Sequence, residues 1–202
     1  MTRSLTIADN WLCTRRSLGI CAGVAWLGVS LLVFGLLYRH TYLPGKIPTL
    51  PRGAEVMEVS SHFRVKLFAH PNCPCTRTSL EQFAESLPRF PAGTQSEIIF
   101  VTAGLAESEN VTSPLVTRAR ELTRTQVRFD TSGAEAEGLG VSVSGEVLAF
   151  DPGGHLVFRG GITSGRGHQG PSTGQAELES IVQGRTPGPC ATPVFGCHLP
   201  TR

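Results

Sequence analysis

Residues 65–87, VKLFAHPNCPCTRTSLEQFAESL, combine an apolar segment, two cysteines one residue apart and an amphipathic segment. The apolar segment Val65–Ala69 is short and bounded by polar residues, as expected of a buried strand. After the cysteines, apolar residues recur at the spacing of one helix face: Leu80, Phe83, Ala84 and Leu87. The stretch therefore predicts a strand, a turn that holds Cys73 and Cys75, and a helix that begins at the cysteine pair.

The rest of the soluble part alternates predicted strands and helices. Strands are predicted at 97–103, 127–129, 147–150 and 156–158, and helices from 113, over 134–139 and over 175–183. The turn Asp151–Gly154 joins the last two strands as a hairpin. A strand–helix–strand order implies parallel pairing, so the expected class is α/β, a central mixed sheet flanked by helices. The cysteine pair falls at the carboxyl end of the first strand, where sites gather in such sheets.

The N-terminal region contains an uncharged apolar segment from Ser17 to Tyr38, 22 residues long. As a helix it spans roughly 33 Å, enough for a hydrocarbon core of about 30 Å. A cleaved signal peptide is the other interpretation, but the run is longer than a signal h-region and no small-x-small site follows it. The segment therefore predicts one uncleaved transmembrane helix that contacts membrane lipid.

The charges around this helix decide its orientation only weakly. Three basic residues precede it and three follow it (Arg3, Arg15 and Arg16; Arg39, Lys46 and Arg52), so the basic residues are nearly balanced. A short N-terminal tail favours an N-terminus that stays inside, with the large C-terminal part extracytoplasmic, on the periplasmic side. In that compartment disulfides form and persist.

The expected organisation has five parts. They are an N-terminal tail (1–16), a transmembrane anchor (17–38), a linker with several prolines (39–62), a globular domain (63–186) and a C-terminal tail that contains two cysteines (187–202). The chain has 18 basic and 16 acidic side chains, a net charge of +2, which gives no electrostatic footprint for nucleic acid. We therefore expect no nucleic-acid partner.

Several motifs carry a resemblance to known proteins. FAHPNCPC (68–75), followed by an amphipathic helix, resembles the active-site turn of the thioredoxin-like superfamily, and the region 127–140 is similar to an insertion in its membrane-tethered, extracytoplasmic branch. Over about residues 60–198, the chain resembles more closely a bacterial group labelled RedB-type proteins. The motifs that carry this resemblance are HPNCPCTRTSLEQ (70–82), DPGGHLVFRGGIT (151–163), GRGHQG (165–170) and PVFGC (193–197). The resemblance implies a thioredoxin-like fold preceded by one transmembrane helix.

Two features depart from the superfamily's pattern. Its cysteines are usually separated by two residues, whereas one residue separates Cys73 from Cys75. The superfamily also has a cis-proline opposite the cysteines, in a loop that blocks metal binding and docks substrate chains. The equivalent stretch here, Val143–Glu146, contains no proline. The second departure leaves open whether general dithiol exchange is retained.

The leading hypothesis for Cys73 and Cys75 is thiol–disulfide exchange with a protein partner. A helix N-terminus stabilises a thiolate, and Arg77 is expected to add to this effect. Cys73 would be the exposed attacking thiolate and Cys75 the resolving thiol, with His70 as a base or as an ordinary polar residue at the strand end. The chain would then be an oxidoreductase that needs no cofactor. A Cys-Pro-Cys disulfide closes a small ring, which makes it easy to reduce.

Two other interpretations of the cysteine pair stay open. In the first, Cys73 and Cys75 bind copper or zinc together with His70 and with His168, His198 or Cys197, and the chain is a metal carrier. Soft sulfur ligands select Cu(I) and Zn(II). In the second, both are inert buried thiols.

The other four cysteines fall into two pairs. Cys190 and Cys197 are expected to form a structural disulfide in the tail, with a second redox pair that exchanges with Cys73 and Cys75 as the alternative. Cys13 and Cys21 lie in or beside the apolar segment and are expected to be unreactive.

Overall fold

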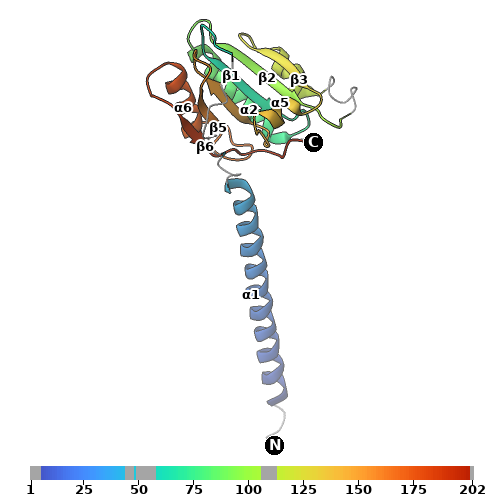
Figure 1. Cartoon of the computed structure of the whole chain (residues 1–202). Coiled ribbons are helices and arrows are strands. Elements are labelled where there is room, and N and C mark those ends of the chain that lie inside the picture. Colours follow the sequence, from blue (N-terminus) through green and yellow to red (C-terminus); the bar gives the residue numbers. More distant parts are fainter. Residues whose placement is uncertain (1–5, 44–47, 49–57, 106–112, 201–202) are drawn as a thin grey trace, which may run out of the picture. The chain divides into compact units, whose positions relative to one another are not determined.

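The computed structural model describes residues 6–43, 48, 58–105 and 113–200, with side chains from residue 18 onward (Figure 1). The chain divides into two compact units, Met1–Leu43 and Pro44–Arg202. Residues 44–47 and 49–57 of the predicted linker lie outside the described residues.

The first unit is one long helix, α1 (Thr6–Tyr42). Its portion Leu18–Tyr42 has a mean hydropathy of 2.3, and none of its most apolar window is buried within the structure. The helix is long and apolar enough to cross a membrane, and it contains the predicted segment Ser17–Tyr38. A signal sequence near the N-terminus would meet the same criteria of length and hydropathy.

The second unit is built on one six-stranded sheet in the order β3-β2-β1-β4-β5-β6. Its strands are β1 (Arg64–Ala69), β2 (Gln95–Val101), β3 (Gln126–Asp130), β4 (Glu146–Phe150), β5 (Leu156–Gly161) and β6 (Cys190–Thr192). β1, β2 and β3 run parallel, as the strand–helix–strand order predicts. The hairpin of β4 and β5 is confirmed, and β4 pairs antiparallel with β1.

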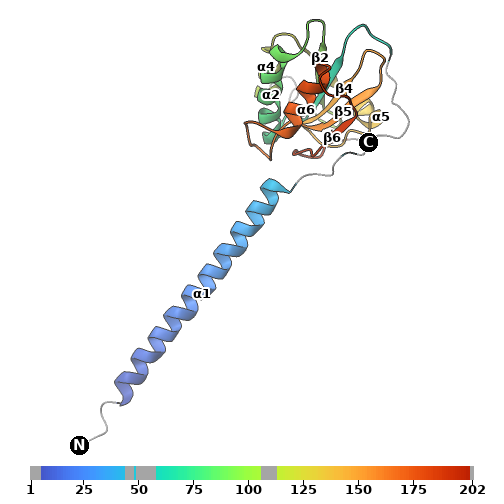
Figure 2. The same cartoon turned by 90° about the vertical axis from the view of Figure 1, so that its left-hand side faces the viewer.

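Helices cover both faces of this sheet. They are α2 (Pro74–Ser86), α4 (Pro114–Arg120), α5 (Ala134–Gly138) and α6 (Thr173–Val182), with a short 3-10 helix, η1 (Leu87–Arg89), after α2. The hydroxyl of Ser113 accepts a hydrogen bond from the N–H of Leu115, which confirms the predicted helix start. Figure 2 shows α2, α4 and α6 on one side of the sheet and α5 on the other, in line with the two buried clusters.

The α5 face buries a residue from the far end of the chain. Phe68 and Leu148 from the strands pack there with Ala136 of α5 and with Leu199. Apolar side chains at this density stabilise the sheet by removing their surface from water. Leu199, near the end of the described residues, is therefore part of the domain core.

The C-terminal segment, expected as a tail outside the domain, thus contributes both a strand and a core residue. β6 pairs parallel with β5 and forms the edge of the sheet next to the hairpin. Close passage of the chain beyond β6 needs the glycine at 161, because a Cβ there would lie 2.5 Å from the carbonyl oxygen of Pro193. A strand of three residues shows no periodicity in the sequence, which is why it was not predicted.

The burial of Leu199 gives a stability prediction. Its side chain is 0% exposed, so Leu199→Ala should lower the free energy of unfolding by about 2–5 kcal/mol through lost burial and a cavity. Unfolding of the full chain in detergent micelles is measured in urea by pulse proteolysis, because both Trp and Tyr are confined to the first 42 residues. Val59→Ala, at a side chain 75% exposed, is the control and should change stability by no more than about 0.5 kcal/mol. Equal effects of the two substitutions would show that the tail is not anchored in the core.

Candidate functional site

The cysteine pair lies in the turn between β1 and α2. Cys73 is the N-cap residue of α2, and Pro74 and Cys75 are the first two helical residues. Pro74 fits this place because the first helical N–H has no partner within the helix. The N–H of Cys73 donates to the carbonyl of His70 at 3.2 Å, and the N–H of Thr76 donates to the carbonyl of Cys73 at 3.0 Å. The turn therefore holds both sulfurs at the N-terminus of the helix, as predicted.

A third cysteine joins this pair. The Sγ of Cys197 lies 2.7 Å from the Sγ of Cys73, although the two residues are 124 positions apart. The sulfurs of Cys73, Cys75 and Cys197 all lie within 4.8 Å of one another. We call these three residues the sulfur cluster.

The main chain around Cys197 pairs with the loop that precedes β4. The N–H of Ser144 donates to the carbonyl of Cys197 at 2.8 Å, and the N–H of Leu199 donates to the carbonyl of Ser142 at 2.8 Å. Val143 and His198 form an antiparallel bridge between these bonds. A proline at position 144 would have no N–H to give, so the absence of proline from Val143–Glu146 permits this pairing.

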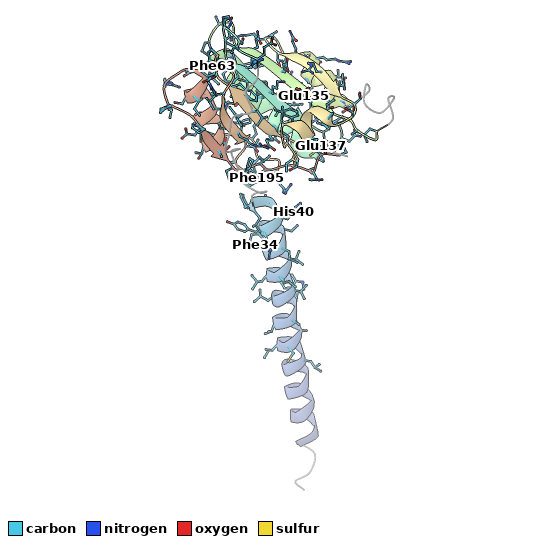
Figure 3. The ribbon with its side chains drawn as sticks, in the orientation of Figure 1. Phe34, His40, Phe63, Glu135, Glu137 and Phe195 are labelled. Carbon is cyan, nitrogen blue, oxygen red and sulfur yellow. The ribbon has the colours of Figure 1, made fainter. Side chains whose placement is uncertain are left out.

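The approach of the tail depends on the glycine before Cys197. A Cβ on Gly196 would lie 1.7 Å from the carbonyl oxygen of Ser144, so any side chain there would push the tail away. Arg166 donates a hydrogen bond to the carbonyl of Gly196. Phe195, on the same tail, is labelled in Figure 3. The position of Cys197 is thus set by close backbone contacts.

The hydroxyl of Ser144 ties this loop to the cysteine turn. It accepts a hydrogen bond from the N–H of His70 at 2.9 Å and lies 2.7 Å from the hydroxyl of Thr76. The hydroxyl of Thr76 also donates to the carbonyl of His70 at 3.1 Å. Buried Ser144 therefore connects the two segments: its hydroxyl binds the cysteine turn, and its N–H binds the tail.

The exposure of the cysteines differs from the prediction. Cys73 was expected to be the exposed thiol, but it is only 2% exposed, whereas Cys197 is exposed. The tail covers Cys73 because its pairing with 142–144 brings Cys197 against it. Cys73 still lines a pocket of about 480 Å³, bordered by Pro71, Asn72, Pro74, Arg77, Ser113, Pro114 and Leu115.

Opposing effects act on the ionisation of Cys73. Burial acts to raise its pKa, but hydrogen bonds from the side chain and backbone of Cys197, the backbone of Cys75 and the side chain of Thr76 outweigh it. The pKa of Cys73 is therefore lowered, in the direction predicted, but the largest lowering effects come from Cys197 on the tail. Cys73 is the thiol of the cluster that most readily becomes a thiolate.

The other two thiols of the cluster ionise less readily. Burial, followed by the negative charge of Cys73, raises the pKa of Cys75. Burial, followed by the hydrogen bond with Cys73 and the charges of Cys73 and Cys75, raises the pKa of Cys197 to about 12. The positive charge of Arg166 partly opposes both shifts. Arg77, the expected source of positive charge, is exposed and borders the pocket.

The histidines singled out in the sequence have other surroundings. His70 accepts a hydrogen bond at Nδ1 from the N–H of Asn72, and burial lowers its pKa, so it is neutral at neutral pH. His168 lies with Nδ1 2.9 Å from the carbonyl oxygen of Arg166, and His198 is exposed beside Cys197. Among the described residues, the potential metal-ligand group contains the three sulfurs and neither His168 nor His198.

Cys190 lies apart from the cluster in the hydrogen-bonded sheet. It is opposite Phe158 in β5 and packs against the larger core cluster. Both Cys190 and Cys197 are free thiols in the structure. The expected disulfide between them stays a prediction, with Cys197 held beside Cys73.

Two residues important to the site were missed in the sequence. Arg166 stands in the motif GRGHQG, which was singled out for its histidine, and Ser144 stands where the superfamily has its proline loop. The lack of a proline was the signal for Ser144. Arg166 has no local signal, because its partner Gly196 is 30 residues away.

Comparisons with known proteins support the fold alone. No protein-family model matches the chain, and no curated protein matches it. An uncharacterized conserved protein from Geobacillus kaustophilus matches with a TM-score of 0.57 at 19% identity, over 80% of this chain and 93% of that chain. A hypothetical protein from Sinorhizobium meliloti matches with a TM-score of 0.56 at 18% identity, over 71% and 81%.

A thioredoxin-like protein from Porphyromonas gingivalis is a weaker match, with a TM-score of 0.43 at 20% identity, over 64% of this chain and 78% of that chain. The fold itself is the one expected from the sequence, with parallel β1 and β2, the antiparallel hairpin and the cysteine turn at the start of α2. The chain therefore has a thioredoxin-like fold preceded by an apolar helix.

The lowered pKa of Cys73 predicts the order of ionisation. As pH rises, Cys73 should lose its proton first, because its pKa is lowered while the pKa values of Cys75 and Cys197 are raised. Thiolate absorbance in the ultraviolet, followed against pH, should lose its earliest step in Cys73→Ser. Cys197→Ala removes a hydrogen bond to the thiolate and should move that step to higher pH. An earliest step that survives in Cys73→Ser would assign the low pKa to another cysteine.

Proposed function

We propose that the chain is a membrane-anchored thiol–disulfide exchange protein in which Cys73 is the attacking thiol. The observation that carries the proposal is the sulfur cluster, in which two further thiols lie within 4.8 Å of a cysteine at the N-terminus of α2. Exchange needs one thiolate and a second thiol close enough to displace it from a mixed disulfide. The partner is a protein that presents a disulfide or a dithiol.

The site chemistry matches the steps of this reaction. The Cys73 thiolate attacks one sulfur of the partner's disulfide, and the other partner sulfur leaves as a thiolate that takes a proton from solvent. A second thiol of the cluster then attacks the Cys73 sulfur and expels the remaining partner thiol. The partner gains two electrons and two protons, and the cluster loses the same number, counting the proton that Cys73 gave to solvent when it ionised. In the opposite direction the same steps oxidise a partner.

The N-terminal helix sets the compartment in the proposal. A single uncleaved helix anchors the domain on the extracytoplasmic side, where disulfides persist. The apolar portion Leu18–Tyr42 supports a membrane anchor. The motifs that resemble RedB-type proteins add a bacterial, membrane-tethered setting, which is consistent with this arrangement.

Trapping of the partner tests the exchange. In Cys75→Ser/Cys197→Ser, no thiol of the cluster remains to resolve the mixed disulfide, so a covalent complex through Cys73 should accumulate. Non-reducing electrophoresis of the full chain from its native membrane should show the complex, and a reductant should release it. Cys190→Ser is the matched control and should trap nothing. Absence of any complex in the double variant, with Cys73 accessible to alkylation, would count against exchange.

The same cluster favours a second candidate function, a carrier of Cu(I) or Zn(II). Three sulfurs within 4.8 Å of one another fit the soft-ligand preference of these ions, and three thiolates leave one coordination position of zinc open. The loop 143–146 lacks the proline that blocks metal binding in the superfamily. The donor set therefore fits either ion, with Cys197 in place of a histidine.

Metal content separates the two candidates. If the chain is a carrier, protein purified under reducing conditions should contain about one copper or zinc ion per chain by elemental analysis. The metal should be lost in Cys73→Ser/Cys75→Ser and retained in Cys190→Ser. Metal-free protein whose cluster thiols oxidise reversibly would reject the carrier and leave thiol exchange.

A further inference from the structure

We propose that Cys197 is a third redox residue, which forms the working disulfide with Cys73 and closes the exchange reaction. This inference rests on the proposed thiol exchange and names the thiol that resolves the mixed disulfide. The sequence favoured Cys75 for that role, since it belongs to the same motif. The contacts in the structure favour Cys197, on the tail, for this role.

Direct contact and freedom from ring strain favour Cys197. Its sulfur lies 2.7 Å from that of Cys73, so only a small movement is needed to reach the disulfide bond length of about 2.05 Å. A bond between Cys73 and Cys75 closes a ring over one intervening residue, Pro74, with few backbone conformations that allow it. Cys197 reaches Cys73 across the fold and is free of that restriction.

The tail holds Cys197 in one register. The bonds from the N–H of Ser144 and the N–H of Leu199 fix the main chain on both sides of Cys197, and burial of Leu199 anchors the segment. The close approach of Gly196 to the carbonyl of Ser144 leaves no room for another alignment. A thiol held in this way has a high effective concentration at Cys73.

The chemistry of the mixed disulfide sets the order of the steps. Once the partner is bonded to Cys73, the Cys73 sulfur is one half of a disulfide and can be attacked by a thiol. The Cys197 thiol, which lies 2.7 Å away, attacks that sulfur and releases its proton to solvent, and the partner sulfur leaves as a thiolate that takes up a proton.

The steps balance with the partner as the oxidant. The partner's disulfide accepts two electrons and two protons and leaves as a dithiol. The sulfurs of Cys73 and Cys197 supply the electrons and form one bond. The pocket of about 480 Å³ beside Cys73 gives the partner sulfur an approach that Cys197 does not occupy.

Peptide mapping of the oxidised full chain in detergent micelles tests this assignment. Trypsin cuts after Lys66, Arg77 and Arg185, so one peptide (67–77) contains Cys73 and Cys75 and another (186–202) contains Cys190 and Cys197. The probe is a glutathione redox buffer, followed by alkylation and digestion without reductant. In Cys75→Ser/Cys190→Ser, the two peptides should become linked, and the link should be lost when Cys197→Ser is added.

A glycine variant tests the role of the tail without removing a thiol. Gly196→Ala should push the tail away from Ser144, lower the yield of the link and make Cys73 easier to alkylate. Gly138→Ala is the matched control, because a Cβ at that helical glycine meets nothing within 4 Å, and it should leave both unchanged.

The outcomes separate this inference from the proposed function. Wild-type protein that oxidises reversibly only within peptide 67–77 would overturn the role of Cys197 and keep thiol exchange through Cys73 and Cys75. Wild-type protein in which neither linkage forms at any glutathione ratio would overturn both. A reversible link between the two peptides, present in Cys190→Ser and absent in Cys197→Ser, supports both.

Discussion

The backbone pairing between residues 142–144 and the C-terminal segment is the constraint on which the candidate site depends. Two hydrogen bonds of 2.8 Å, from Ser144 to Cys197 and from Leu199 to Ser142, bring a sulfur from the end of the chain to the start of α2. Without this pairing the site would contain only Cys73 and Cys75, with Cys73 uncovered. The pairing in turn needs an N–H at 144 and no side chain at 196. One loop therefore decides the number of thiols in the site and their exposure.

The same contacts explain how a buried thiol has a lowered pKa. Burial alone would keep Cys73 protonated, since a charge loses its hydration in the interior. Hydrogen bonds from Cys197, Cys75 and Thr76 replace that hydration and stabilise the thiolate. Cys197 thus both covers Cys73 and activates it. The loop 165–170 supports this arrangement, because Arg166 contacts Gly196 while Gly170 is hydrogen-bonded to Gln82 of α2.

Much of the fold was predictable because its signals are local. The apolar run before the cysteines, the helix face from Leu80 and the cap at Ser113 each depend on residues that are neighbours in sequence, and each element is present. The cysteine turn at the N-terminus of α2 followed from the same stretch.

The remainder depended on contacts between distant residues. β6 is too short to show a pattern, and the position of Cys197 depends on backbone bonds to a loop more than 50 residues earlier in the chain. The exposure of Cys73 was predicted incorrectly for the same reason, because the residue that covers it comes from the tail. Arg77 is adjacent in sequence to the cysteines, yet Arg166 supplies the charge that acts on Cys75 and Cys197.

The most direct measurement is the set of cysteine Cβ chemical shifts in the full chain, labelled with ¹³C at cysteine and compared between reduced and glutathione-oxidised samples. A Cβ resonance moves strongly on disulfide formation, so each cysteine reports its own state without cleavage or alkylation. If the sulfur cluster is a thiol-exchange site closed by the tail, the resonances of Cys73 and Cys197 move together, while those of Cys21 and Cys190 stay. A shared shift of Cys190 and Cys197, with Cys73 unchanged, would mean that the tail carries only a structural disulfide and that Cys73 is not the exchanging thiol.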